Sequence, residues 1–576
     1  MNSFIEFHFK RTLALFVILT AILPGMSCSR VKPGKLALIN GKVYTVNPKM
    51  PWAEAVVVDS NTIVFTGSTA DAKKYIGSET KVIDLNGRMV MPGFIDAHMH
   101  PALGSFVSSA VLLDYFGTTA SWFDIIRKTI KENPDRKYYF FANFRSITFG
   151  PEGPLKADLD AIESSKPVIV FDNGFHSAWV NSKALEVAGI EKNTPDPVPG
   201  GHYYVRDKNG NPSGYCIEAQ SFIPIILKLG VTPADIMKME MATFPKLSAF
   251  GVTSVYDAGF VMEPEIFQAY LQLEKEGNLP MRVFASHWIS NPKAVPTAIK
   301  DLQLLDKSYR SNLFRVNTMK IMLDGTSDAL SSAMFDDYLP GGKGNGFVLL
   351  PQNELNDFVC KIDSAGFNIQ IHSIGNRAIS DALTAFENLK QKRGFTPTRK
   401  TVVHCQFFMP NTVERFKALR DVMANFTPSW MVSDPATLKI VGPEVYGRNM
   451  LFNSMDQAGV RICCGTDFPV GAGIEDVNPF KQIEIGHMRR NIGAADTDIL
   501  PPASEKLSLE TLIKGYTING AYELGVENLI GSLEQGKRAD IIVLEKNIFE
   551  QKSDDIHNNT VLLTVMDGKV VYDKMK

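Results

Sequence analysis

Six side chains in this 576-residue chain have the types and spacing of a metal site. His98 and His100 are two residues apart at the end of the run GFIDAHMH, so in a strand both imidazoles project to the same side. Two imidazoles on one face can supply half of the ligands of zinc or a similar cation. The other four are His372, His404, Asp467 and Lys320. A lone histidine is more often a hydrogen-bonded core residue, but six such groups at matching positions favour a metal site.

Each of the six lies in an apolar run that is typical of a β-strand. The eight runs are GFIDAHMH, GVTSVYDAG, MRVFASHW, VNTMKIMLDG, FNIQIHSIG, TVVHCQ, VMANFTPSW and VRICCGTDFP. They alternate with helical stretches, as βα units around a parallel sheet do. The pattern predicts an α/β fold, a (β/α)8 TIM barrel, with its active site at the C-terminal ends of the strands.

The two ends of the chain have a different pattern from the middle. Residues 35–90 and 527–576 consist of short β-rich runs, with turn signals such as Asn86-Gly87 and Asp567-Gly568. We expect these ends to form one small β-sandwich domain built from both termini. The barrel is then expected over residues 91–526, with an insertion at about 101–250 between its first two strands.

The first 28 residues have the features of an export signal. Lys10 and Arg11 precede a short apolar run that ends near Leu23, and Ser27-Cys28 follows it. The run is too short for a comfortable transmembrane helix. We expect a signal peptide over residues 1–28, of the lipoprotein type, with Cys28 as the lipidation site; cleavage near Ser27 without lipidation is the alternative. Either reading predicts an exported protein, periplasmic or attached to a membrane through an N-terminal lipid.

Composition narrows the class of partner. Sixty basic and 62 acidic residues give a formal net charge of −2, and no basic stripe is visible, which argues against a nucleic-acid partner. The chain is 45% apolar and 21% charged, which is typical of a folded globular protein. A small-molecule substrate is therefore the expected partner, and the sequence is compatible with an oligomer.

The motifs, taken in order, resemble a known family. PGFIDAHMHP, followed by strand-end histidines and an aspartate, resembles the metal-dependent amidohydrolases. PVIVFDNGFHSAWVNSKALEVAGI, QIHSIGNRAI and CGTDFPV resemble the amidohydrolase-3 branch, which includes N-substituted formamide deformylase-like enzymes. The resemblance extends from Leu36 to Tyr572 and implies a barrel with a β-sandwich formed by both termini.

The resemblance also implies roles for the six residues. One divalent metal, zinc by expectation, would be held by His98, His100 and Asp467, and a second by His372 and His404. Lys320 would bridge the two ions as a carbamate formed with CO₂, since burial lowers the pKa of a lysine and frees its amine. In the alternative, Lys320 pairs with a neighbour such as Asp324, and the site holds a single ion.

Pocket residues follow from the same resemblance. His176, Trp179 and Asn181, in the insertion, are the expected substrate-binding residues, and Glu218 and Arg448 are weaker candidates. His202, His287 and His487 fit no ligand position and are expected to be structural or at the surface. Relative to the family pattern, Asn376 replaces a frequent aspartate, and residues 326–329 also differ, which leaves the substrate open.

The expected reaction is hydrolysis of a C–N bond, in a linear amide or an N-formyl group, by a metal-activated water. Asp467 would act as general base and then as general acid. A cyclic amide or an ester is the alternative substrate on the same scaffold. A non-catalytic binding protein descended from such an enzyme would lack some of the ligands, and none is missing here.

Overall fold

The computed structural model describes residues 32–107, 110–115, 117–149, 152–230, 232–259, 262–339, 344–470 and 473–575. The expected signal peptide, with Cys28, lies outside these residues. Within the described ranges, no helix has both the length and the apolar character needed to cross a bilayer.

The centre of the molecule is an eight-stranded parallel sheet whose strand order follows the chain. Its strands are β8 (Phe94–Met99), β15 (Val252–Asp257), β16 (Arg282–Ile289), β17 (Phe314–Met322), β18 (Asn368–Ser373), β19 (Lys400–His404), β20 (Val422–Phe426) and β21 (Ile462–Cys464). Each of the eight predicted runs overlaps one of these strands, with at most two residues of a strand outside its run. The (β/α)8 barrel predicted from the sequence is therefore confirmed.

The segment after β21 returns to the first strand and completes the barrel. The backbone N–H of Asp467 donates to the carbonyl of His98 at 2.8 Å, and that of His100 donates to the carbonyl of Phe468 at 2.9 Å. A Cβ added to Gly465 would lie 2.5 Å from atoms of His98, so this approach requires glycine. The closure thus brings Asp467 beside the two histidines of β8.

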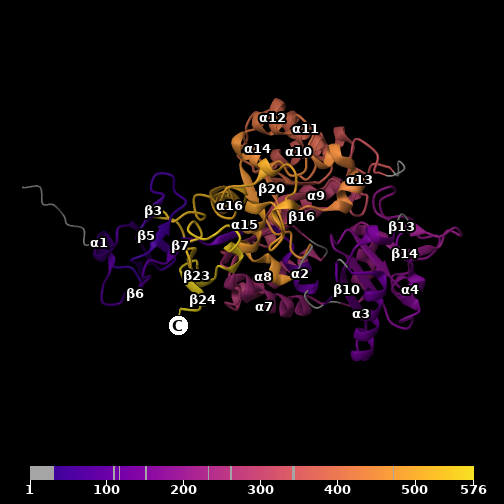
Figure 1. Cartoon of the computed structure of the whole chain (residues 1–576), viewed down its shortest axis with the longest axis horizontal. Coiled ribbons are helices and arrows are strands. Elements are labelled where there is room, and N and C mark those ends of the chain that lie inside the picture. Colours follow the sequence, from indigo (N-terminus) through magenta and orange to yellow (C-terminus); the bar gives the residue numbers. More distant parts are fainter. Residues whose placement is uncertain are drawn as a thin grey trace, which may run out of the picture.

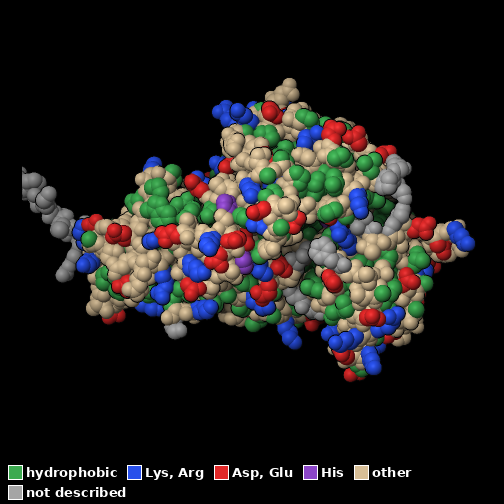
Figure 2. All heavy atoms as spheres, viewed as in Figure 1, with side chains coloured by type: hydrophobic (Ala, Val, Ile, Leu, Met, Phe, Trp, Pro, Cys, Tyr) green, Lys and Arg blue, Asp and Glu red, His purple; other side chains and the backbone are tan. Residues whose placement is uncertain are grey.

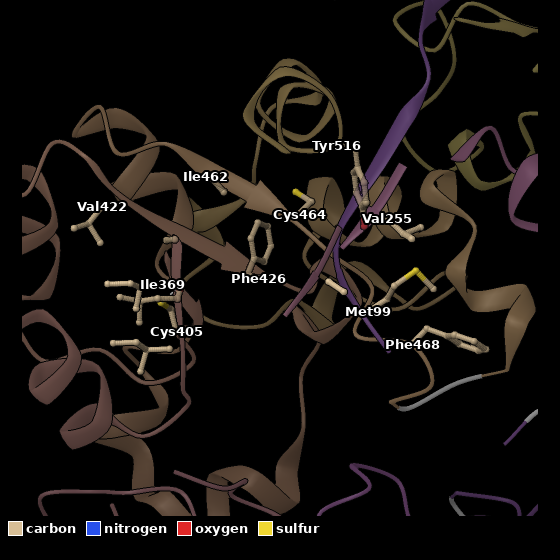
Figure 3. Packing of buried hydrophobic residues seen from close by; sticks show 14 of the residues in the cluster. Met99, Val255, Ile369, Cys405, Val422, Phe426, Ile462, Cys464, Phe468 and Tyr516 are labelled. Atoms are coloured by element: carbon tan, nitrogen blue, oxygen red, sulfur yellow. Dashed lines mark hydrogen bonds between the residues drawn. The ribbon is translucent and has the colours of Figure 1, made fainter. Parts of the chain in front are cut away.

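Helices cover the outside of the barrel (Figure 1). The main ones are α8 (Glu263–Lys275), α9 (Val295–Ser308), α10 (Gln352–Ser364), α11 (Asn376–Arg393), α12 (Thr412–Ala418), α13 (Pro435–Tyr446), α14 (Phe452–Gln457), α15 (Pro479–Met488), α16 (Leu509–Gly515) and α17 (Ile518–Glu523). Phe426, Cys464 and Tyr516 pack in the resulting core (Figure 3). Cys463 belongs to a different buried cluster from Cys464, which fits the alternating faces of a strand.

The insertion between β8 and β15 forms a second sheet, of six strands in the order β13-β14-β12-β11-β10-β9. Its strands are β9 (Val111–Leu112), β10 (Tyr139–Phe144), β11 (Val168–Asp172), β12 (Ser177–Val180), β13 (Tyr203–Arg206) and β14 (Pro212–Ile217). The helices of this region are α2 (Pro101–Val107), α3 (Thr119–Glu132), α4 (Lys156–Asp160), α5 (Ser182–Ala188), α6 (Ala219–Lys228) and α7 (Pro233–Ala249). The insertion lies on one side of the barrel, and the β-rich ends lie on the other (Figure 1).

The β-rich ends form two sheets. One contains β1 (Leu36–Ile39), β4 (Ala55–Asp59), β5 (Thr62–Gly67) and β6 (Lys81–Asp84). The other joins β2 (Lys42–Tyr44), β3 (Trp52–Ala53) and β7 (Met89–Pro92) to the C-terminal strands β22 (Ile541–Leu544), β23 (Val561–Met566) and β24 (Lys569–Asp573). Side chains of both sheets share one core, which includes Leu38, Val56, Ile541 and Leu563. The sandwich is thus built from both termini.

Charged side chains of both signs are interspersed over the face of the molecule in Figure 2. Several form ion pairs between parts of the fold. Arg282 of β16, for example, pairs with Asp540 and with Asp567 of the sandwich. This contact fixes the sandwich against the barrel strand beside it.

Candidate metal and active site

Three of the six predicted ligands converge at the C-terminal ends of the barrel strands. The Nε2 atoms of His98 and His100 each lie 3.3 Å from Oδ1 of Asp467. One ligand atom from each of the three residues falls within 4.8 Å of the others, which is close enough to share an ion. Burial raises the pKa of the Asp467 carboxyl, but its close contacts with the imidazoles of His100, His404 and His98 outweigh burial and hold the pKa well below its usual range.

The second pair of histidines adjoins the first. The ring of His404 lies 5.0 Å from that of His98 and 4.5 Å from that of His372, between centroids. Nδ1 of His404 is 4.0 Å from Oδ2 of Asp467. Burial lowers the pKa of both His372 and His404 well below the ordinary value, so both rings stay neutral and can act as ligands.

Lys320 lies inside this cluster. Its Nζ is 3.4 Å from Nε2 of His98 and 3.2 Å from Oε1 of Gln370. The side chain is fully buried, and burial lowers the pKa of its amine to about 7. The alternative ion pair between Lys320 and Asp324 does not form, since Asp324 Oδ1 instead accepts a hydrogen bond from His372 Nδ1 at 2.9 Å.

Acceptors behind the histidines fix the orientation of three of the four rings. Nδ1 of His98 faces Gln370 Oε1 at 3.1 Å, and Nδ1 of His100 faces the carbonyl of Gly259 at 2.6 Å. With Asp324 behind His372, these contacts leave Nε2 of each ring directed away from its acceptor. Such outer partners normally set the tautomer of a metal-binding histidine. Gln370, which the sequence analysis did not select, lies two residues before His372 and therefore on the same face of β18.

These residues fit a divalent metal. Nδ1 of His404 is buried and has no hydrogen-bond partner within the described residues, although it faces the carboxylate of Asp467. A buried polar nitrogen without a partner costs free energy unless a ligand satisfies it. Four imidazoles, one carboxylate and one amine form a nitrogen and oxygen donor set that suits zinc or a similar ion.

A cavity that is partly open to solvent lies over this cluster. The insertion and the barrel both line it. Apolar side chains make up much of its wall: Leu103, Phe171, Phe175, Phe222, Trp288 and Met322. The indole N–H of Trp288, whose residue lines the cavity, is buried without a hydrogen-bond partner in the described part of the chain. The cavity therefore suits a small and largely apolar molecule with a few polar atoms.

His176 is the expected pocket residue that reaches this cavity. Its ring lies 5.4 Å from that of His372, and its Nδ1 lies 2.7 Å from Oε2 of Glu218. Burial lowers the pKa of His176, but the charge of Glu218 and the hydrogen bond to it raise that pKa to about 9. Glu218, a weaker candidate in the sequence, also lines the cavity. The two are 42 residues apart, so no sequence spacing could have paired them.

Trp179 and Asn181, the other two expected substrate-binding residues, do not line this cavity. Trp179 is fully buried in the core of the insertion, where its indole N–H donates to the carbonyl of Leu155 at 2.8 Å. Asn181 caps α5 by accepting from the N–H of Ala184 and also accepts from that of Val168. Both side chains hold the insertion together.

The other residues singled out in the sequence also differ in whether they line the cavity. Arg448 donates to the carbonyl of Phe408 and does not line the cavity. His287 pairs with Glu263, and His487 contacts the carbonyl of Leu507, as structural residues do. His202, which was expected to be structural or exposed, is buried and lines the cavity. Its Nδ1 also accepts from the N–H of Gln220 at 3.1 Å, so His202 has the structural role that was expected and lies at the cavity as well.

A barrel with a two-part sandwich and a histidine–aspartate–lysine cluster defines a metal-dependent hydrolase. Residues 81–572 match the model of the amidohydrolase family, and the chain belongs to this family. It is 30% identical to the exoenzymes regulatory protein AepA of Pectobacterium carotovorum subsp. carotovorum over 73% of this chain and 92% of that one. It is 25% identical to the N-substituted formamide deformylase of Arthrobacter pascens, over 94% of this chain and 98% of the relative.

A solved structure has the same fold. An uncharacterized metal-dependent hydrolase from Pyrococcus horikoshii superposes with a TM-score of 0.70 and 22% identity. The match covers 90% of this chain and 99% of that one. The resemblance to amidohydrolases that the sequence motifs indicate is thus confirmed, and the protein is a hydrolase acting on carbon–nitrogen bonds.

Proposed function

We propose that this hydrolase cleaves a small linear amide or an N-formyl amine. The observation that carries the proposal is the place of Asp467, a buried carboxylate between two histidine pairs at the floor of an apolar cavity. The formamide deformylase named above, which is similar along nearly its whole length, supports this substrate class.

The cation pair is part of the proposal. His98, His100 and Asp467 would hold one divalent metal, zinc by its donor set, and His372 and His404 a second, with Lys320 carboxylated between them. When bound, such ions lower the pKa of a coordinated water and polarise a carbonyl group. The low pKa of the Lys320 amine supports the bridge, because only the neutral amine reacts with CO₂.

Asp467 is the proton acceptor in this scheme. Its pKa is held low, so the carboxylate is ionised and can take a proton from the attacking water. Cleavage of the C–N bond also requires that a proton be delivered to the leaving nitrogen. Apolar wall residues such as Phe171 and Phe222 exclude water from the substituent of the substrate and orient it by packing.

A substrate panel tests this proposal. Metal-loaded protein would be assayed with N-formyl amines, N-acyl amino acids, hydantoins and simple esters. We expect turnover of the N-formyl amines or other linear amides. Turnover of hydantoins or esters alone would instead favour the cyclic-amide or ester alternative. No turnover of any of them, with metal confirmed on the protein, would overturn the assignment and favour a binding role.

We also propose that the protein is exported and anchored by a lipid on Cys28, on the strength of the charged and apolar segments that precede this residue. Expression of the full chain with radiolabelled palmitate tests this. Label in the wild type and none in Cys28→Ser is expected. Export without label in both proteins would instead indicate simple secretion.

A further inference from the structure

We propose that His176 is a second catalytic residue, which gives a proton to the leaving nitrogen, and that Glu218 is its positioning residue. The inference rests on the proposed amide hydrolysis. His176 lies between β11 and β12, so the insertion delivers its imidazole into a cavity whose metal cluster comes from the barrel. A carboxylate can only accept, so Nδ1–H donates to Glu218 Oε2, and Nε2 is the ring nitrogen left for a substrate.

Besides its contact with Nδ1 of His176, Glu218 makes two further hydrogen bonds that fix its position. Its Oε1 accepts from the Ser331 hydroxyl at 2.5 Å, and its backbone N–H donates to the carbonyl of His176 at 2.6 Å. Its own φ of 63° is rare for a residue with a side chain. A Cβ on Gly325 would lie 2.0 Å from Glu218 Oε1, so the glycine leaves the space that the carboxylate occupies. The backbone of Glu218 is thus in a strained conformation, and this conformation places its carboxylate next to Nδ1 of His176.

The position of the His176–Glu218 pair distinguishes it from two other histidine–glutamate pairs among the described residues. His287 with Glu263 and His557 with Glu484 have the same Nδ1-to-Oε2 distance of 2.7 Å. None of those four residues lines the cavity. A histidine–glutamate pair is therefore a recurrent stabilising contact in this fold, and of these three pairs only that of His176 and Glu218 lines the cavity.

The proposed step balances as follows. Asp467 takes a proton from water as the new C–O bond forms at the carbonyl carbon. The C–N bond then breaks, its electron pair stays on nitrogen, and the Nε2 proton of His176 passes to that nitrogen. Amide and water give carboxylic acid and amine, and the proton on Asp467 returns to His176 through water. A carboxylate behind an imidazole stabilises its protonated form, as a proton donor needs.

Dependence on the leaving group tests the proposal. The substrates share one acyl group and differ in the amine: an alkylamine, which needs a proton to leave, and p-nitroaniline, which needs it far less. In His176→Gln we expect kcat/KM to fall on the order of 10²-fold or more for the alkylamide, a typical effect of losing a general acid, and less than about 10-fold for the anilide. Glu218→Gln should show the same selective pattern with a smaller loss.

His557→Gln is the matched control, because it breaks a pair of the same geometry outside the cavity; both activities should stay at wild-type level. Metal content and melting temperature are measured for every variant, and Glu218→Gln carries the test if His176→Gln loses metal. Equal losses on both substrates, with metal and melting temperature retained, would overturn the role of His176 alone. A metal-loaded wild type that cleaves neither amide would overturn the proposed function, and this inference with it.

Discussion

Asp467 and His404 face each other across the site, with Oδ2 of the carboxylate 4.0 Å from Nδ1 of the imidazole. That nitrogen has no hydrogen-bond partner among the residues that the structure describes. The other carboxylate oxygen lies 3.3 Å from both His98 and His100. One buried carboxylate therefore spans the space between two histidine pairs, as expected of a group that contacts both a cation and the reacting water.

Asp467→Asn should abolish most of the activity while the protein stays folded. An amide has no proton-accepting oxygen of comparable basicity, so kcat should fall on the order of 10³-fold. Steady-state kinetics on the best substrate of the panel, with metal content measured in parallel, checks this. A variant that retained metal and lost less than tenfold in kcat would exclude Asp467 as the general base.

Asp324→Asn should weaken metal binding. Asp324 accepts from His372 Nδ1 and from the backbone N–H groups of Ile374, Gly375 and Ala333, so an amide NH₂ placed there would oppose a donor. Loss of such an outer partner typically costs about 10–100-fold in metal affinity. Competition with a chelator measures this. Asp357→Asn, at an exposed ion pair on α10, is the matched control, and equal affinities in the two variants would contradict the role of Asp324.

His202 should make stability depend on pH. Burial lowers the pKa of His202 from the ordinary 6.5 to about 4. Between these values the unfolded chain binds a proton that the folded chain does not, so the free energy of unfolding falls as the pH falls, by up to about 1.4 kcal/mol per pH unit. In His202→Gln, whose amide oxygen can accept from the N–H of Gln220 as the ring does, this contribution should be absent. If the free energy of unfolding changed with pH in the same way in both proteins, this role of His202 would be contradicted.

Trp179→Ala should lower stability without changing the chemistry. The indole is fully buried, and truncation of such a side chain typically costs about 3–5 kcal/mol. Melting temperature should therefore fall while KM and the metal content of the folded protein stay close to wild type. A raised KM at an unchanged melting temperature would instead restore Trp179 as a substrate contact.

The barrel and the convergence of the candidate ligands could be predicted from the sequence because each of these residues lies at or near the end of an apolar run. In a parallel barrel, all such ends meet at one face, so strand position alone brings together His98, Lys320 and Asp467. Residues two apart share a face of a strand, which is why His98 and His100 could be paired in advance.

The pocket could be predicted less well, because its residues come from loops and from a separate sheet. The family resemblance suggested a shared role for His176 and Trp179, but alternation along β12 places Ala178 and Trp179 in different buried clusters. That alternation was the available signal. The pairing of His176 with Glu218 and the cavity position of His202 depend on tertiary contacts that no local pattern specifies.

Metal content per chain, measured on wild type and Lys320→Ala purified without chelators, tests the central claim most directly. Lys320 lies against His98 and Gln370 in a fully buried position, where a bridging carbamate would join the two histidine pairs. The account predicts two metal ions per chain in the wild type and one or fewer in the variant. One ion in both proteins would contradict the bridge, and none in either would contradict a metal-dependent hydrolase.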